Sequence, residues 1–188
     1  YKLDKKVIDA EIDIMREIGV EIRTGVEVGK DITLDELRAQ GYKAFYVAIG
    51  CQGGRLPGIP GQDAEGVTTA IDFLHEANCG QRKLSGKVIV VGGGNVAIDA
   101  ARVALRSGAS EVTMLSLETE DIMPASPAER AEAREDGVVI NPGWGPKEVL
   151  TADGKVSGVV FKKCTSVFNA EHRFAPTYDE QQLLTLDA

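Results

Sequence analysis

The pattern of apolar and polar positions predicts an alternation of helices and strands along the first part of the chain. Apolar residues recur at helical spacing over residues 4–18, with an aspartate at the start as N-cap and Gly19 after the end. Residues 20–23 alternate apolar and polar, which predicts a half-buried strand, and a capping-box pattern begins a second helix over residues 33–41. The continuous apolar run at residues 44–49 predicts a strand buried on both faces.

The second part of the chain repeats this alternation more clearly. Its patterns predict helices over residues 69–77, 95–107 and 126–136, and strands over residues 87–91, 111–115 and 138–141. Residues 148–168 predict two antiparallel strands that turn at Asp153-Gly154, whereas the tail from Asn169 is polar and predicts no defined element. Strands that alternate with helices are typical of the α/β class.

A connection rich in glycine and proline separates the two parts. Residues 51–66 contain Gly53-Gly54 and the run Pro57–Gly61, a composition typical of a connection, and we place the main domain boundary there. The chain begins at Tyr1 rather than at a methionine, and it ends in an apolar stretch, residues 183–186, that leads towards another strand. We therefore expect a domain excised from a longer protein.

Composition excludes several classes of function. The 188 residues hold 21 Lys and Arg against 29 Asp and Glu, a net charge of -8, which argues against nucleic acid as a partner. No apolar run approaches the roughly 20 residues that span a bilayer, and no secretory leader is present, so no membrane partner is expected. Cys51, Cys79 and Cys164 form no CxxC pattern and suit a reducing, cytoplasmic compartment. With His75 and His172 far apart, we expect no metal site.

The clearest chemical signal is the pattern Gly92-x-Gly94-x-x-Ala97 between a predicted strand and a predicted helix. In a dinucleotide fingerprint the first glycine permits a tight turn, the second lets a pyrophosphate approach the backbone, and the small third residue permits close packing. The N-terminus of the helix offers unpaired N–H groups and a partial positive charge to the phosphates. We therefore expect a Rossmann-like parallel sheet with flanking helices and an antiparallel excursion. The alternative is a glycine-rich turn that binds nothing.

The fingerprint also calls for a group about 20 residues further on that meets the ribose. Glu118 is the first acid after the predicted strand over residues 111–115. A carboxylate there accepts hydrogen bonds from ribose hydroxyls and repels a 2′-phosphate, which favours NAD(H) over NADP(H). Alternatively, Glu118 belongs to a solvated acidic run with Glu120 and Asp121.

The sequence from Val90 to Arg102 resembles the nucleotide signature of the glutamate synthase small-subunit family, whose members are flavin and pyridine-nucleotide oxidoreductases related to adrenodoxin reductase. The strand end Ala48–Gly50, the turn Gly58–Gly61 and the loop Met123–Ala125 match the family in the same order. The fingerprint and the resemblance together assign these residues to the cofactor site: Gly50, Gly92, Gly93, Gly94, Asn95, Val96, Ala97, Glu118, Met123 and Pro124. No catalytic residue is assigned, because hydride transfer between two cofactors depends on proximity.

The resemblance implies an FAD domain interrupted by an inserted NAD(P) domain, with hydride passing from the nicotinamide to the flavin. Residues 1–60 would belong to the FAD domain, residues 61–168 would form the NAD(P) domain, and residues 169–188 would lead back to the FAD domain. The full-length protein would hold FAD, but this fragment lacks the family's FAD-binding segments. We therefore expect the fragment alone to be inactive. The resemblance also implies an electron-transfer partner, a domain or subunit that carries iron–sulfur clusters.

One departure from the family bears on the cofactor. The family commonly has Tyr-Arg-Arg where this chain has Ser116-Leu117-Glu118. The loss of two cations that would hold a 2′-phosphate again favours NAD(H).

Several residues have a plainer interpretation beside a functional one. Asp99 and Arg102 could order the cofactor loop or form a surface ion pair; Trp144 could contact the cofactor or cover a core edge; Met123 and Pro124 could line the nicotinamide or anchor a loop. Cys51 is expected to be an ordinary free thiol. Two other classes of function also remain open, a nucleotide-sensing module and a scaffold that docks a partner subunit.

Overall fold

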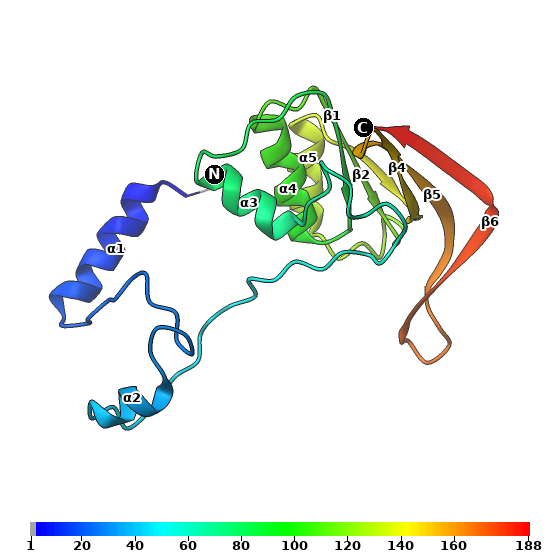
Figure 1. Cartoon of the computed structure of the whole chain (residues 1–188). Helices are drawn as coiled ribbons and strands as arrows, with labels where there is room; N and C mark the ends of the chain where they lie inside the picture. Colours follow the sequence, from blue (N-terminus) through cyan, green and yellow to red (C-terminus); the bar gives the residue numbers. More distant parts are fainter. Residues whose placement is uncertain (1–2) are drawn as a thin grey trace. The chain divides into compact units, whose positions relative to one another are not determined.

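The structure, a computed structural model, describes residues 3–188 and consists of two compact units, Tyr1–Gln52 and Gly53–Ala188 (Figure 1). The first two residues of the chain lie outside the described range. In the first unit, α1 (Lys5–Glu17) and α2 (Leu34–Ala39) confirm the two predicted helices. Asp4 caps α1 by accepting from the Lys6 N–H at 2.9 Å, and Thr33 begins α2 with both hydrogen bonds of a capping box.

The two strands predicted in the first unit are absent from its described residues. Residues 20–23 and 44–49 form no strand, and Val47 and Ile49 are 75 % and 76 % exposed. An extended segment becomes a strand only when a neighbour satisfies its N–H and C=O groups. Both described sheets belong to the second unit, so the apolar run at 44–49 has the composition of a buried strand without a paired neighbour.

A parallel sheet forms the centre of the second unit (Figure 1). Its strands run in the order β1-β2-β3, with Val91 opposite Leu115 and Leu115 opposite Asn141. The elements of this part are β1 (Lys87–Val91), β2 (Glu111–Ser116), β3 (Val139–Pro142), α3 (Ala70–Asn78), α4 (Asn95–Arg106) and α5 (Pro127–Glu135). All six confirm predicted elements, with ends displaced by one residue at most. The parallel pairing places the carboxyl ends of the three strands at one edge of the sheet.

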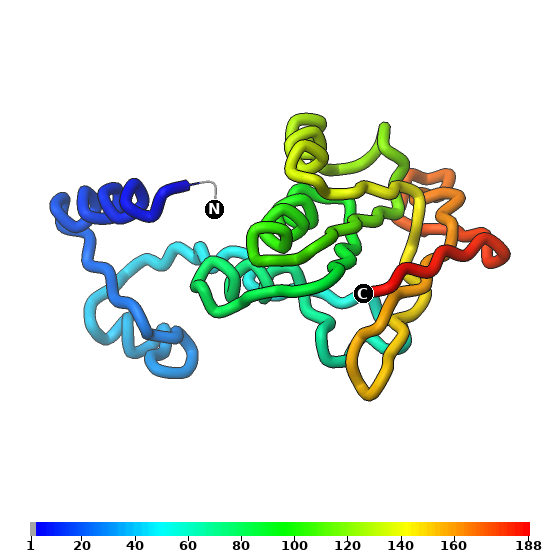
Figure 2. The backbone as a smooth tube through the Cα atoms, turned by 90° about the horizontal axis from the view of Figure 1, so that it is seen from above, coloured from blue at the N-terminus to red at the C-terminus, as the bar shows by residue number. Residues whose placement is uncertain are grey.

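An antiparallel sheet covers the other face of the parallel strands, on the side away from α4 (Figure 2). It contains β4 (Trp144–Ala152), β5 (Lys155–Phe168) and β6 (Phe174–Asp187). Asp153 and Gly154 connect β4 to β5 with positive φ angles of 51° and 79°, as the predicted hairpin turn requires.

The tail predicted to be ill-defined is instead the strand β6, a correction that concerns its structure and not its domain assignment. β6 pairs with β5 over most of its length, from Phe174 opposite Phe168 to Asp187 opposite Gly158. Only some of its side chains are half-buried, among them Leu184 and Leu186, which pack against the core. A polar composition is therefore compatible with this strand, because one face meets solvent.

The core explains why the glycine turn has a fixed place. Small residues along one side of α4, Ala97, Ala100, Ala101 and Ala104, are at most 8 % exposed and let the helix approach the sheet closely. Val112 and Met114 of β2 pack on this helical side, whereas Leu115 packs with Phe161 on the side of the antiparallel sheet. β2 is thus buried on both faces, and its carboxyl end is held rigidly beside the turn that follows β1.

Candidate functional site

The turn between β1 and α4 is built from glycines for two different physical reasons. Gly92 has φ of +143°, a conformation that residues with a side chain rarely adopt. A Cβ at Gly92 would also lie 3.3 Å from the Cβ of Ala97, so helix and turn approach closely only because both residues are small. The N–H of Gly92 donates to the Leu115 carbonyl at 2.8 Å, which ties the turn to β2.

Gly94 is the N-cap of α4 and leaves the start of the helix open. Its φ of -93° is ordinary, no side chain caps the helix, and a Cβ placed on it would meet nothing within 4 Å. Asn95 and Val96 follow as exposed first-turn residues, whose N–H groups have no intrahelical partner. An open helix start of this kind carries a partial positive charge and suits a phosphate or other anion.

Glu118 lies directly against this turn. A Cβ at Gly93 would be 2.6 Å from the Glu118 Oε2 atom and 3.0 Å from the Ser116 Cβ, so a side chain at this position would displace the carboxylate from where it lies. The Glu118 backbone is fixed because its carbonyl accepts from the Ser116 hydroxyl at 3.1 Å and from the Gly143 N–H at 2.9 Å. The tertiary structure therefore brings together the glycine turn and the acid that sequence analysis assigned to the ribose.

The loop over residues 122–126 is bound to the same turn. The Ala125 N–H donates to the Gly93 carbonyl at 2.9 Å, and the Ser126 N–H donates to Asn95 Oδ1 at 3.0 Å. Met123 is 6 % exposed and belongs to the core around α4, whereas Pro124 is exposed. Of the two interpretations of Met123, burial favours the loop anchor.

The family can now be assigned by comparison with known proteins. The model of the family described as pyridine nucleotide-disulphide oxidoreductase matches residues 6–175, which include the glycine turn and Glu118. The chain belongs to this family.

Curated relatives of this chain confirm the resemblance found in the sequence. It is 35 % identical over 173 residues to the glutamate synthase [NADPH] small chain of Escherichia coli K12, covering 85 % of this chain and 36 % of the relative. It is 37 % identical over 151 residues to the NAD-dependent dihydropyrimidine dehydrogenase subunit PreT of Escherichia coli O157:H7, covering 79 % of this chain and 36 % of the relative. The chain spans 23 % to 36 % of the length of the first such relatives.

A solved structure shares the fold. FprA of Mycobacterium tuberculosis in complex with NADPH aligns with a TM-score of 0.76 at 19 % identity. The alignment covers 98 % of this chain and 57 % of FprA.

Gly50 and Trp144 were considered in the sequence for other roles. Gly50 is in the first unit, and its assignment to the cofactor site stays a prediction. Trp144 packs with Leu115 and Phe161 between the sheets, with the Lys163 ammonium 4.9 Å from its ring centroid, so covering a core edge describes its observed role. Among residues 3–188, no group of three or more potential metal ligands occurs, and no helix has the length and apolar character needed to cross a membrane.

Arg102 of helix α4 is buried and not at the surface. It is 8 % exposed, which contradicts the surface position expected for its ion pair with Asp99, and its guanidinium contacts Glu132 of α5 and the C-cap residue Asp136. Arg102 also lowers the pKa of the Asp136 carboxyl, chiefly by donating a hydrogen bond to it. The signal available in the sequence was the row of acids on α5 at helical spacing, which a buried arginine on a neighbouring helix could satisfy.

Thiol reactivity provides a direct check on the fold of this chain. Burial raises the pKa of the Cys164 thiol, whereas Cys51 and Cys79 are exposed. We expect iodoacetamide at pH 8 to alkylate Cys51 and Cys79 at least ~10-fold faster than Cys164, because the thiolate is the reactive form and must be accessible. Mass spectrometry of peptides at successive times measures the three rates. In denaturant the rates should converge; equal rates in the native protein would contradict the burial of Cys164.

Proposed function

We propose that this chain supplies the dinucleotide-binding part of a flavin-dependent oxidoreductase that takes hydride from NAD(P)H. The observation that carries the proposal is the open start of α4 at Gly94 with the Glu118 carboxylate beside it. The space that a side chain at Gly94 would fill is available to a pyrophosphate, whose oxygens would accept from the first-turn N–H groups. Glu118 would then accept from the hydroxyls of the adenosine ribose.

The chemistry of the complete protein follows from the resemblance stated above. When FAD is bound in the parent, it would accept a hydride, a proton with two electrons, from C4 of the reduced nicotinamide. We assign no FAD contact to the described residues. The role of this chain is to bind and orient the dinucleotide so that the nicotinamide meets the flavin, because such transfers depend on proximity. Onward transfer to an iron–sulfur domain or subunit is part of the same proposal.

We further propose that NAD(H) is favoured over NADP(H). A carboxylate at the ribose position would repel the 2′-phosphate of NADP(H), whereas it would accept hydrogen bonds from the free ribose hydroxyls of NAD(H). A specific observation favours the second candidate, NADPH: the Lys163 Nζ would be 2.9 Å from a Cβ on Gly143, the residue that donates to the Glu118 carbonyl. The relatives' names include both nucleotides, so they leave the preference to experiment.

Calorimetric titration of the chain with NADH and with NADPH, at matched ionic strength, tests both proposals. We expect NADH to bind more tightly than NADPH. Tighter NADPH binding would support the dinucleotide site and overturn the proposed preference for NADH. In that case Lys163→Ala is expected to lower the affinity for NADPH and not that for NADH. Absence of binding by either nucleotide would contradict a site completed within this chain and favour the docking scaffold. Nucleotide binding without any flavin in the complete protein would favour the sensing module.

A further inference from the structure

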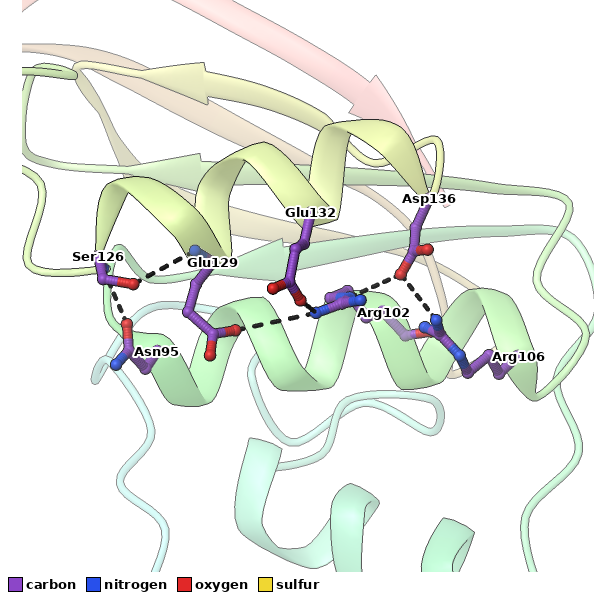
Figure 3. Close-up of polar contacts among 7 residues, drawn as sticks. All are labelled: Asn95, Arg102, Arg106, Ser126, Glu129, Glu132 and Asp136. Atoms are coloured by element: carbon purple, nitrogen blue, oxygen red, sulfur yellow. Dashed lines mark hydrogen bonds and ion pairs between the residues drawn. The ribbon is translucent and has the colours of Figure 1, made fainter. Parts of the chain in front are cut away.

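Arg102, a buried residue of helix α4, contacts acids of helix α5 and of its C-terminal end (Figure 3). Its Nε donates to Asp136 Oδ2 at 2.6 Å, and its Nη1 donates to the Glu132 carboxylate and lies 3.9 Å from the Glu129 carboxylate. Arg106, one turn further along α4, places Nη2 2.9 Å from the same Asp136 oxygen. Arg102 thus contacts three acids, from Glu129 in the first turn of α5 to the C-cap residue Asp136.

The residues that begin α5 are the ones that contact the glycine turn. Ser126 caps α5 by accepting from the Glu129 N–H at 3.2 Å, and its own N–H donates to Asn95 Oδ1 at 3.0 Å (Figure 3). The preceding Ala125 N–H donates to the Gly93 carbonyl at 2.9 Å. Because both hydrogen bonds join the start of α5 to the start of α4, a displacement of one helix along the other would break them.

We propose that Arg102 is a positioning residue for the dinucleotide site. By fixing α5 on α4, it holds the loop over residues 122–126 on the glycine turn and so keeps the helix start in its binding geometry. The inference rests on the proposed function for the identity of the ligand, and it extends that function to a residue in the third turn of α4 that does not touch the glycine turn.

The chemistry of the contact requires an arginine. The planar guanidinium donates from Nε and Nη1 to two different carboxylates at once, which the single ammonium of a lysine cannot reproduce with the same geometry. The hydrogen bond from Arg102 lowers the pKa of Asp136, because it favours the charged form of the carboxyl. Removal of the guanidinium would break the ion pairs that join α4 to Glu132 and Asp136, leaving Asp136 only the contact with Arg106, so α5 would be held less firmly on α4 and could shift along it.

Arg102→Met is the central variant, because methionine preserves most of the packing and removes the charge. We expect the NADH dissociation constant to rise about 10-fold, a coupling of the usual size between linked sites. We also expect amide hydrogen exchange at Ala125 and Ser126 to become faster than at other amides of the fold. If Arg102 only stabilised the fold, these two amides would change no more than the others. Arg102→Lys should recover only part of the affinity. Asp136→Asn, which preserves shape, should act in the same direction and serves if Arg102→Met does not fold.

Two controls separate positioning from stability. Arg106→Met removes the more exposed neighbour of Asp136 and should change the NADH affinity less than about 2-fold. Phe161→Leu destabilises the core between the sheets, away from α5, and should lower the melting temperature without raising the NADH dissociation constant. If Arg102→Met lowers the melting temperature but leaves affinity and exchange like those of Phe161→Leu, the positioning role is wrong. If the wild-type chain binds no dinucleotide, the proposed function fails, and exchange at Ala125 and Ser126 still decides whether Arg102 holds the loop.

Discussion

Gly94→Val is expected to weaken NADH binding about 100-fold, the loss of two hydrogen bonds to a charged phosphate at roughly 1.5 kcal/mol each. The fold should survive, since Gly94 has an ordinary φ and a Cβ there meets nothing within 4 Å. The new side chain would instead fill the space over the start of α4 that the pyrophosphate needs. Calorimetric titration with NADH measures the loss, and thermal unfolding monitored by circular dichroism verifies the fold.

Gly53→Val is the matched control for this variant. Gly53 also lacks a left-handed φ, and a Cβ there also meets nothing within 4 Å, but it lies outside the turn between β1 and α4. The control should therefore bind NADH like the wild-type chain. If the wild-type chain binds NADH and Gly94→Val binds it equally tightly, the glycine turn is not part of the site. The observation on which the proposed function depends would then be lost.

Glu118→Arg is expected to shift the ratio of NADPH to NADH affinity by about 100-fold towards NADPH. A guanidinium at the ribose position would exchange repulsion of the 2′-phosphate for a charge-assisted contact, a change of roughly 3 kcal/mol. Glu118→Gln removes only the repulsion and should give an intermediate ratio. Parallel titrations with the two nucleotides, repeated at two salt concentrations, measure the shift and its electrostatic part.

Asp121→Arg is the control for the Glu118 variant, because it makes the same change of charge at an exposed position three residues away. It should alter the ratio by no more than about 3-fold, as expected of a screened surface charge. If Asp121→Arg and Glu118→Arg shift the ratio equally, the effect is one of net charge, and the Glu118 carboxylate does not meet the ribose.

The sequence alone determined the elements with strong local signals. The parallel strands, the helices around them and the hairpin at Asp153-Gly154 were all predicted, because their periodicity, caps and turn residues act over a few neighbouring positions. The glycine turn was predicted in the same way, since the requirement for Gly92 and Ala97 comes from the crossing of one strand and one helix. These local signals were also sufficient to recognise the resemblance to a known family, which the comparison with known proteins confirmed.

Only the tertiary structure decided the features that depend on partners distant in the sequence. The apolar residues 44–49 remain unpaired and the polar β6 becomes a strand, because strand formation requires a neighbour and composition does not reveal one. The contact of Glu118 with Gly93 depends on how β1 and β2 align, and the burial of Arg102 depends on where α5 packs. Such contacts follow from the register and packing of whole elements, so a charged residue that looks solvent-exposed in the sequence can be the one that joins two helices.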